Sequence, residues 1–210
     1  MKKLSVLCFI LPLFLFAQEE DFQTWSKVEL GYKISKKLSA ELTEGFRLRE
    51  NSSLPAKTFT DLSLTYRHNK KWRFGTGYRF IQLFDLNQDI HLRHRMYADV
   101  VLRNKVKRWR VNYRSRLQHQ VGVNHMEQYY RGRFSTSYNV RKTPLEPSVA
   151  IEFFSDLSAL QIDKMRYTVA ISHPLSKRSE ITLYYRLQEE INVADPSLLY
   201  ILGTGLSLSL

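Results

Sequence analysis

The chain has 210 residues, with 32 Lys and Arg against 20 Asp and Glu, a formal net charge of +12 and a sequence pI near 9.8. A hydrophobic content of 43% and a mean hydropathy of -0.36 exclude a bundle of membrane-spanning helices, each of which needs about 20 mostly apolar residues. An aromatic content of 13% excludes a disordered polycation, because disordered chains contain few aromatic residues.

The N-terminal segment has the layout of a secretory signal peptide. Two lysines precede an apolar run over residues 4–16, and Ala17 supplies a small residue at a cleavage site. The apolar run is too short to cross a membrane as a helix. We therefore expect residues 1–17 to be removed after export and residues 18–210 to form the mature protein. Cleavage would also remove Cys8, which is the only cysteine of the chain.

The rest of the chain alternates apolar and polar residues with a period of two, which is typical of β-strands with two different faces. In the first segment only Trp25 breaks the alternation, because it falls among polar positions. The alternating segments lie at about residues 22–34, 38–49, 61–67, 72–80, 90–103, 108–117, 129–140, 147–157, 163–173, 178–191 and 198–210.

The length of these segments favours a membrane barrel. Strands of soluble proteins usually have about five or six residues, whereas a tilted strand needs about 9–11 residues to cross a bilayer. One face of most segments is aromatic and aliphatic, and the other carries many charges, which a soluble protein could seal inside only at a high cost. The sequence thus predicts an all-β fold, a single antiparallel transmembrane β-barrel in the outer membrane of a Gram-negative-type bacterium. A soluble, lipocalin-like periplasmic barrel is the alternative, with apolar residues inside and polar residues outside.

Short connections with paired cations lie just before four of the segments. These pairs are Lys36 and Lys37, Lys70 and Lys71, Lys107 and Arg108, and Lys177 and Arg178. The other connections are somewhat longer, so we expect short periplasmic turns and modest extracellular loops. Trp72 and Trp109 would then be aromatic side chains at the periplasmic membrane interface.

The alternation is compatible with ten, eleven or twelve strands. Bacterial single-chain barrels have even numbers of strands, but the pattern gives eleven segments. Either residues 22–34 are not a full strand, which leaves ten, or two strands are merged near residues 140–165, which makes twelve. Pro144 and Pro147 make the second region the harder one to divide. The sequence therefore predicts 10 to 12 strands.

Four short motifs give a resemblance to a known family. They are FQTW at 22–25, SKKLS at 35–39, EGFR at 44–47 and HRMYAD at 94–99. With the export signal before them, these motifs resemble the outer-membrane proteins called domain of unknown function 2490, and the resemblance covers nearly the whole mature chain. It implies a location and an architecture, and it supplies neither an activity nor catalytic residues.

The polar face of the segments is rich in cations, which we expect to line the lumen as a basic belt in the strand halves nearer the longer loops. The belt consists of Arg47, Arg49, Arg79, Arg93, Arg95, Arg114, Arg116, Arg131, Arg133, Lys164, Arg166 and Arg186. The expected acidic partners in the lumen are Glu29, Glu41, Asp99 and Glu152.

Two roles for this belt stay open. It can form a structural network of Arg–carboxylate pairs that fills a narrow interior. Alternatively, unpaired arginines can draw in small anions, as in an anion-selective, porin-like pore, or bind the phosphates of lipopolysaccharide.

An enzyme is a further alternative that we do not expect. Some small outer-membrane barrels hydrolyse lipids, and here only His119 and His125, with Ser115 or Ser135, could supply such a site. The histidines show no metal-ligand spacing, and we expect no metal and no cofactor.

The expected partners are outer-membrane lipids, lipopolysaccharide and, during insertion, the barrel-assembly machinery. That machinery would recognise the last segment, residues 198–210, although it ends in Leu210 where an aromatic residue is usual. We expect no nucleic-acid partner, because the chain is exported and its arginines follow strand alternation instead of forming one patch. The pattern contains no information on the oligomeric state.

Overall fold

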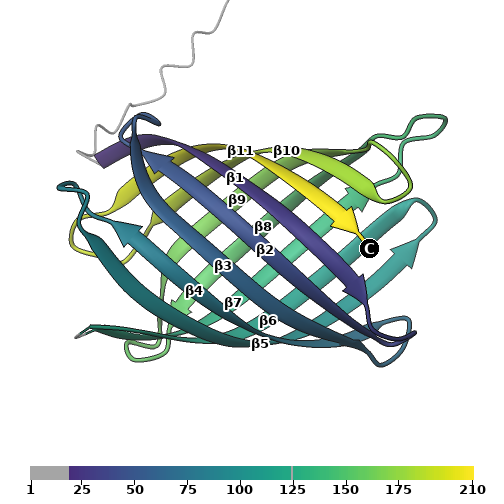
Figure 1. The fold of residues 1–210 in the computed structure, drawn as a ribbon, viewed down its shortest axis with the longest axis horizontal. Coiled ribbons are helices and arrows are strands. Elements are labelled where there is room, and N and C mark those ends of the chain that lie inside the picture. Colours follow the sequence, from purple (N-terminus) through teal and green to yellow (C-terminus); the bar gives the residue numbers. More distant parts are fainter. Residues whose placement is uncertain (1–18, 124) are drawn as a thin grey trace, which may run out of the picture.

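The computed structural model describes residues 19–123 and 125–210, which form eleven strands in one closed barrel (Figure 1). The predicted signal peptide, residues 1–17, lies outside the described residues. The strands are β1 (Glu19–Lys33), β2 (Leu38–Arg49), β3 (Leu54–Arg67), β4 (Trp72–Phe84), β5 (Ile90–Val106), β6 (Trp109–Gly122), β7 (His125–Tyr138), β8 (Glu146–Asp156), β9 (Gln161–Pro174), β10 (Ser179–Glu190) and β11 (Ser197–Ser209). The predicted all-β barrel is therefore confirmed. No helix within the described ranges is long and apolar enough to cross a membrane.

The pairing of the first and last strands settles the strand count at eleven. Every consecutive pair is antiparallel, whereas β1 and β11 are parallel, with Phe22 opposite Tyr200. An odd number of strands joined by consecutive hairpins places the first and last strands in the same direction, and a parallel ladder is only slightly less stable per residue. The expectation of an even count was wrong for this reason. Residues 22–34 do fall almost entirely within a full strand, and the stretch around Pro144 is the connection between β7 and β8.

The connections fall into two groups, one at each end of the barrel. We call the end with connections 34–37, 68–71, 107–108, 139–145 and 175–178 the turn end. The opposite loop end carries connections 50–53, 85–89, 123–124, 157–160 and 191–196. All are short, and the longest, residues 139–145, belongs to the turn end. In the loop 85–89 the Asp89 N–H donates to Asp85 at 2.9 Å, which together with His91 holds the pKa of Asp85 below its usual range.

The outer wall is apolar and much of the inner wall is charged. Outward-facing Met96 and Phe134 are 62% and 58% exposed, whereas inward-facing Arg131 and Glu152 are 8% and 4% exposed. A soluble barrel has the opposite arrangement, since its apolar side chains fill the interior. The distribution therefore contradicts the lipocalin-like alternative.

The inner wall also carries a buried aromatic cluster that strict alternation did not predict. Trp25, Tyr184 and Ile201 pack together inside the barrel, against Ala170 and Leu199. Trp25 thus breaks the apolar–polar alternation because it faces the lumen. Its ring lies among charged side chains, with the guanidinium carbon of Arg47 3.6 Å from the ring centre.

A glycine on β11, directly opposite Tyr184 in the ladder with β10, makes room for this cluster. A Cβ atom at Gly203 would lie 2.1 Å from the Tyr184 ring, so Gly203→Ala must displace a buried aromatic side chain. We expect a loss of about 1–3 kcal/mol in the free energy of unfolding, as for other overpacked interiors. Urea titration in detergent micelles measures it. Gly31→Ala is the matched control, because its Cβ would lie 3.6 Å from the nearest atom, and equal losses in both variants would contradict the argument.

Candidate functional site in the lumen

The interior contains two cavities, separated by a layer of side chains. Their volumes are about 370 Å³ toward the turn end and about 400 Å³ toward the loop end. The side chains that line both cavities are Trp25, Arg47, Arg79, Arg131 and Arg166. We call these five residues the middle layer. Four of its five members are arginines, so a solute passing from one cavity to the other would meet guanidinium groups.

All twelve cations of the predicted belt line at least one cavity. Besides the four arginines of the middle layer, the loop-end cavity is lined by Arg49, Arg93, Arg95 and Lys164. The turn-end cavity is lined by Arg114, Arg116, Arg133 and Arg186. The cations therefore extend along both cavities, whereas the sequence predicted a belt in the strand halves nearer the loop end. Strand position alone misplaced them because barrel strands are tilted and staggered, so it does not give height along the axis.

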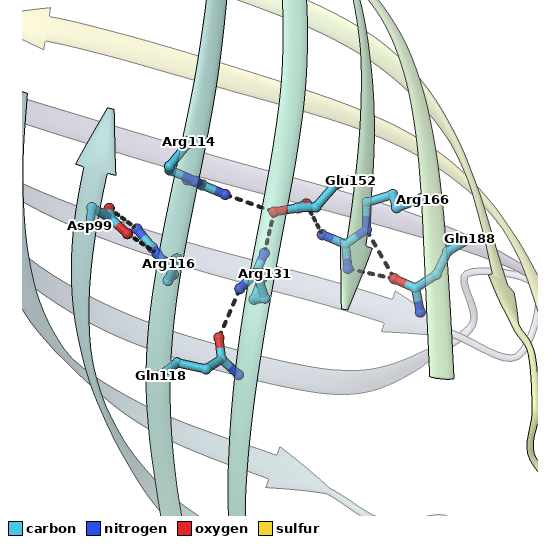
Figure 2. A network of polar contacts seen from close by, with 8 residues as sticks. All are labelled: Asp99, Arg114, Arg116, Gln118, Arg131, Glu152, Arg166 and Gln188. Atoms are coloured by element: carbon cyan, nitrogen blue, oxygen red, sulfur yellow. Dashed lines mark hydrogen bonds and ion pairs between the residues drawn. The ribbon is translucent and has the colours of Figure 1, made fainter. Parts of the chain in front are cut away.

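The strongest polar network surrounds Glu152 on β8 (Figure 2). Its carboxylate accepts hydrogen bonds from Arg114 on β6 at 2.7 Å, Arg131 on β7 at 2.9 Å and Arg166 on β9 at 3.3 Å. The network continues as Arg131 donates to Gln118 and Arg166 donates to Gln188 on β10, both at 3.0 Å. One buried carboxylate thus joins four consecutive strands.

Two further carboxylates engage arginines in the turn-end cavity. Asp99 accepts two bonds of 2.6 Å from Arg116, the bidentate geometry that suits a guanidinium group. Asp61 accepts from Arg79 at 2.7 Å and from the Tyr97 hydroxyl at 2.7 Å. Asp61 was absent from the predicted acidic partners, although it shares the polar phase of its strand, which was the available signal.

The other two predicted acids interact less extensively. Glu29 pairs with Lys27 and accepts from Ser207 at 2.7 Å. Glu41 lines the turn-end cavity and accepts a 3.4 Å bond from Thr43. Within the described part of the chain, Glu41 makes no ion pair. Glu41 therefore lies in the lumen but does not connect several strands as Glu152 does.

Aromatic rings of the inner wall hold several arginines in place. The guanidinium carbon of Arg47 lies 3.6 Å from the centre of the Trp25 ring, and Arg186 lies 4.0 Å from that of Tyr184. A ring face attracts a cation without neutralising its charge. These contacts therefore fix the orientation of the arginines while their positive charge stays available to an anion.

The two cavities differ sharply in charge. The described residues that line the turn-end cavity include five carboxylates, whereas Glu127 is the only carboxylate among those that line the loop-end cavity. The cations of the loop-end cavity are Arg47, Arg49, Lys57, Arg79, Arg93, Arg95, Arg131, Lys164 and Arg166. Lys57 was not among the predicted residues, because the register between β2 and β3 shifts next to it, which interrupts the alternation at the start of β3.

Arg49 is the least satisfied of these cations. Its Nε and Nη2 atoms are buried and have no hydrogen-bond partner within the described part of the chain. Lys57, in the same cavity, makes no ion pair with any described residue. Since buried donors are almost always satisfied in folded proteins, this corner of the loop-end cavity is suited to an anionic ligand.

Comparison with protein families shows which family this barrel belongs to. The family model described as "Protein of unknown function (DUF2490)" matches residues 22–196, which is most of the chain. The chain belongs to the DUF2490 family. No curated protein matches it.

The DUF2490 barrel also resembles a solved structure, the "KdgM porin". The match has a TM-score of 0.50 and 11% sequence identity, and covers 81% of this chain and 89% of that chain. At this identity the likeness concerns the fold alone. It agrees with the closed, mostly antiparallel barrel described above.

The two predicted interface aromatics, Trp72 and Trp109, begin strands at the turn end of the DUF2490 barrel and are 40% and 50% exposed. The ring of Trp109 packs against Tyr138 at a centroid distance of 4.7 Å. Amphipathic rings favour the boundary between lipid tails and water. Their role at an interface stays a prediction.

The residues considered for lipid hydrolysis do not come together. The alternation of β6 and β7 puts His119 and Ser115 on the outer wall and Ser135 on the inner wall. The side chain of His125 lies outside the described residues. Within the described ranges, no group of three or more His, Cys, Asp or Glu could hold a metal ion.

Proposed function

We propose that this DUF2490 barrel spans the outer membrane and provides a narrow, anion-selective pathway through its lumen. Its exposed apolar wall and long strands support placement in a bilayer, where unpaired backbone groups are avoided only by helices and closed barrels. The fold likeness to a protein named as a porin supports the same placement. The turn end would face the periplasm and the loop end would face outward.

The observation that carries the anion preference is the lining of the loop-end cavity. Nine Lys and Arg face a single described carboxylate there, and that carboxylate, Glu127, already accepts from Gln120 at 2.9 Å and lies 3.7 Å from Arg93. Low-dielectric walls around charges of one sign concentrate counter-ions. Anions should therefore accumulate in this cavity.

The middle layer supplies the selectivity in this proposal. Its four arginines and Trp25 fill the lumen between the cavities, so only a small hydrated ion or a slender anion could pass between them. Rings of Arg and Lys serve as selective constrictions for anions and phosphates in other pores. We expect a conductance well below that of a wide, water-filled porin.

Planar-bilayer recording with the purified protein tests this function. Under a KCl gradient, the reversal potential should have the sign of Cl⁻ preference, and the unitary conductance should be small. Either the absence of conductance or a preference for K⁺ would overturn the proposal.

A structural brace is the second candidate function, and the Glu152 network favours it. Three arginines donate to that one buried carboxylate. This arrangement would stabilise the barrel whether or not a solute passes through the lumen. Silence in the bilayer recording, together with a stable folded barrel, would select the brace over the pore.

Export and assembly form part of the same proposal. Residues 1–17 would direct secretion and be cleaved, which leaves residues 18–210 as the mature barrel. β11 would be the segment recognised by the barrel-assembly machinery. Its outward Leu202 alternates with the buried, inward Ile201 and Gly203, as a lipid-facing strand requires.

A further inference from the structure

The charges of the connections differ completely between the two ends of the barrel. Each of the five turn-end connections contains two Lys or Arg and no acid, whereas the five loop-end connections contain four acids and no Lys or Arg. The loop-end acids are Glu50, Asp85, Asp89 and Asp195. The turn end therefore presents a ring of positive charge to whatever surface lies beside it.

One turn-end connection forms a small basic pocket. This pocket, of about 230 Å³, is lined by Lys105, Lys107, Arg108 and Arg110, with Glu146 as its carboxylate. Glu146 is engaged within the barrel, because it accepts from Arg110 at 2.8 Å and from Ser137 at 2.7 Å. The pocket thus has an excess of cations over acids in its lining.

The backbone at this pocket adds a second observation. Residues 107 and 108 form a two-residue hairpin loop between Val106 and Trp109, and Lys107 has a φ of 55°. Such positions favour Gly or Asn, because a side chain is strained at positive φ. The tight turn brings the side chains of two consecutive cations, Lys107 and Arg108, to the end of the barrel.

An apolar groove on the outer wall begins beside the same hairpin. The groove has a volume of about 620 Å³, and its lining includes Trp109, Tyr138, Pro147, Val149 and Val169. The packed rings of Trp109 and Tyr138 lie where the groove meets the turn end. The backbone N–H of Asn139, next to Tyr138 and in the lining of the basic pocket, donates to the Arg108 carbonyl at 3.1 Å. The alternation of β5 and β6 places Lys105 and Arg110 of the pocket on the lumen side, whereas Trp109 lies on the outer wall. The hairpin tip at Lys107 and Arg108 therefore stands at the rim, between the basic pocket and the groove.

We propose that the tip of this hairpin, together with the groove on the outer wall, binds one anionic glycerophospholipid from the leaflet at the turn end. Its phosphate would contact Lys107 and Arg108 at the rim of the barrel, and an acyl chain would lie in the groove past Trp109. Charge complementarity selects this occupant, since Lys and Arg beside a lipid-facing wall attract anionic headgroups and phosphate suits Arg and Lys donors. The inference rests on the proposed membrane placement and does not depend on conductance.

Native mass spectrometry of the folded barrel tests this site. The protein is equilibrated in micelles with equimolar phosphatidylglycerol and phosphatidylethanolamine of the same acyl chains. We expect one retained phosphatidylglycerol, preferred several-fold over phosphatidylethanolamine. The double variant Lys107→Gln/Arg108→Gln should lose this preference.

Two further variants separate local binding from general charge. Lys70→Gln/Lys71→Gln removes the same charge from the turn between β3 and β4, strands that do not line the groove, and should keep the preference. Val169→Trp fills the groove without changing charge and should reduce retention of the lipid several-fold. Heat-modifiable gel migration confirms that each variant is folded.

Several outcomes would overturn the inference. Equal loss of the preference in Lys107→Gln/Arg108→Gln and in Lys70→Gln/Lys71→Gln would mean that charge acts over the whole turn end and not at this hairpin. Preferred retention of phosphatidylethanolamine would assign the groove to a lipid without net charge. A wild-type barrel that inserts into vesicles but shows no lipid preference would contradict this inference alone. Failure to insert at all would instead contradict the proposed membrane placement.

Discussion

Replacing Glu152 with Gln should lower the free energy of unfolding by about 3–5 kcal/mol, the usual cost of removing one partner from a buried ion pair. Glu152 is 4% exposed, and Arg114, Arg131 and Arg166 all donate to it. A neutral amide would leave three guanidinium groups crowded together without a counter-charge. Urea titration in lipid vesicles measures the change, with folded and unfolded forms separated by gel migration.

Glu41→Gln is the matched control for this prediction. It also removes one lumen carboxylate, but Glu41 accepts only a 3.4 Å bond from Thr43 among the described residues and is exposed to the cavity. The change should stay within about 0.5 kcal/mol, as for substitutions away from buried networks. Similar losses in both variants would show that Glu152 does not brace strands β6 to β9.

Reversing two charges in the loop-end cavity should weaken anion selectivity strongly. The double variant Arg49→Glu/Lys57→Glu places carboxylates where two cations make no ion pair with a described residue. A unit charge pair 4 Å apart is worth about 4 kcal/mol at an effective dielectric constant of 20, and about 1.4 kcal/mol already changes a ratio tenfold. We therefore expect the Cl⁻/K⁺ permeability ratio to fall by about tenfold or more in planar bilayers.

Lys36→Glu/Lys37→Glu is the control for selectivity. It changes the net charge by the same amount, in a turn outside both cavities. Its permeability ratio should stay close to that of the wild type. An unchanged ratio in Arg49→Glu/Lys57→Glu would mean that ions do not pass this part of the loop-end cavity.

The strands and their faces were predictable because a period of two is a local property of the sequence. The alternation around Arg114 and Arg116 was enough to place both on the inner wall. It also gave eleven segments, and the doubt about that count came from a general rule on even numbers. That rule does not hold here, because β1 and β11 close the barrel in parallel register.

The contacts inside the lumen were not predictable, because they depend on the stagger between strands. Glu152 meets arginines of β6, β7 and β9, and nothing in the spacing of these residues along the chain indicates such a meeting. The same holds for Gly203 beneath the Tyr184 ring, which lies across a strand pair. In the sequence, Trp25 was visible as an exception to the alternation. The reason for this exception, a position in the middle layer of the lumen, could be seen only in the closed barrel.

The odd number of strands has a consequence for topology. Glu19 begins β1 at the loop end, and Ser209 ends β11 at the turn end. The two ends of the described barrel therefore lie on opposite sides of any membrane that it spans. A probe that reaches only one side should separate the loop-end connections from the turn-end connections.

Cysteine labelling in intact cells tests the membrane-spanning barrel most directly. Cys8 is the only cysteine and lies in the segment that we expect to be cleaved, so Asn87→Cys at the loop end and Lys36→Cys at the turn end would each carry a single thiol. With a membrane-impermeant maleimide, we predict that position 87 is labelled in intact cells and position 36 only after permeabilisation. Protection of both positions until permeabilisation would contradict a barrel that spans the outer membrane.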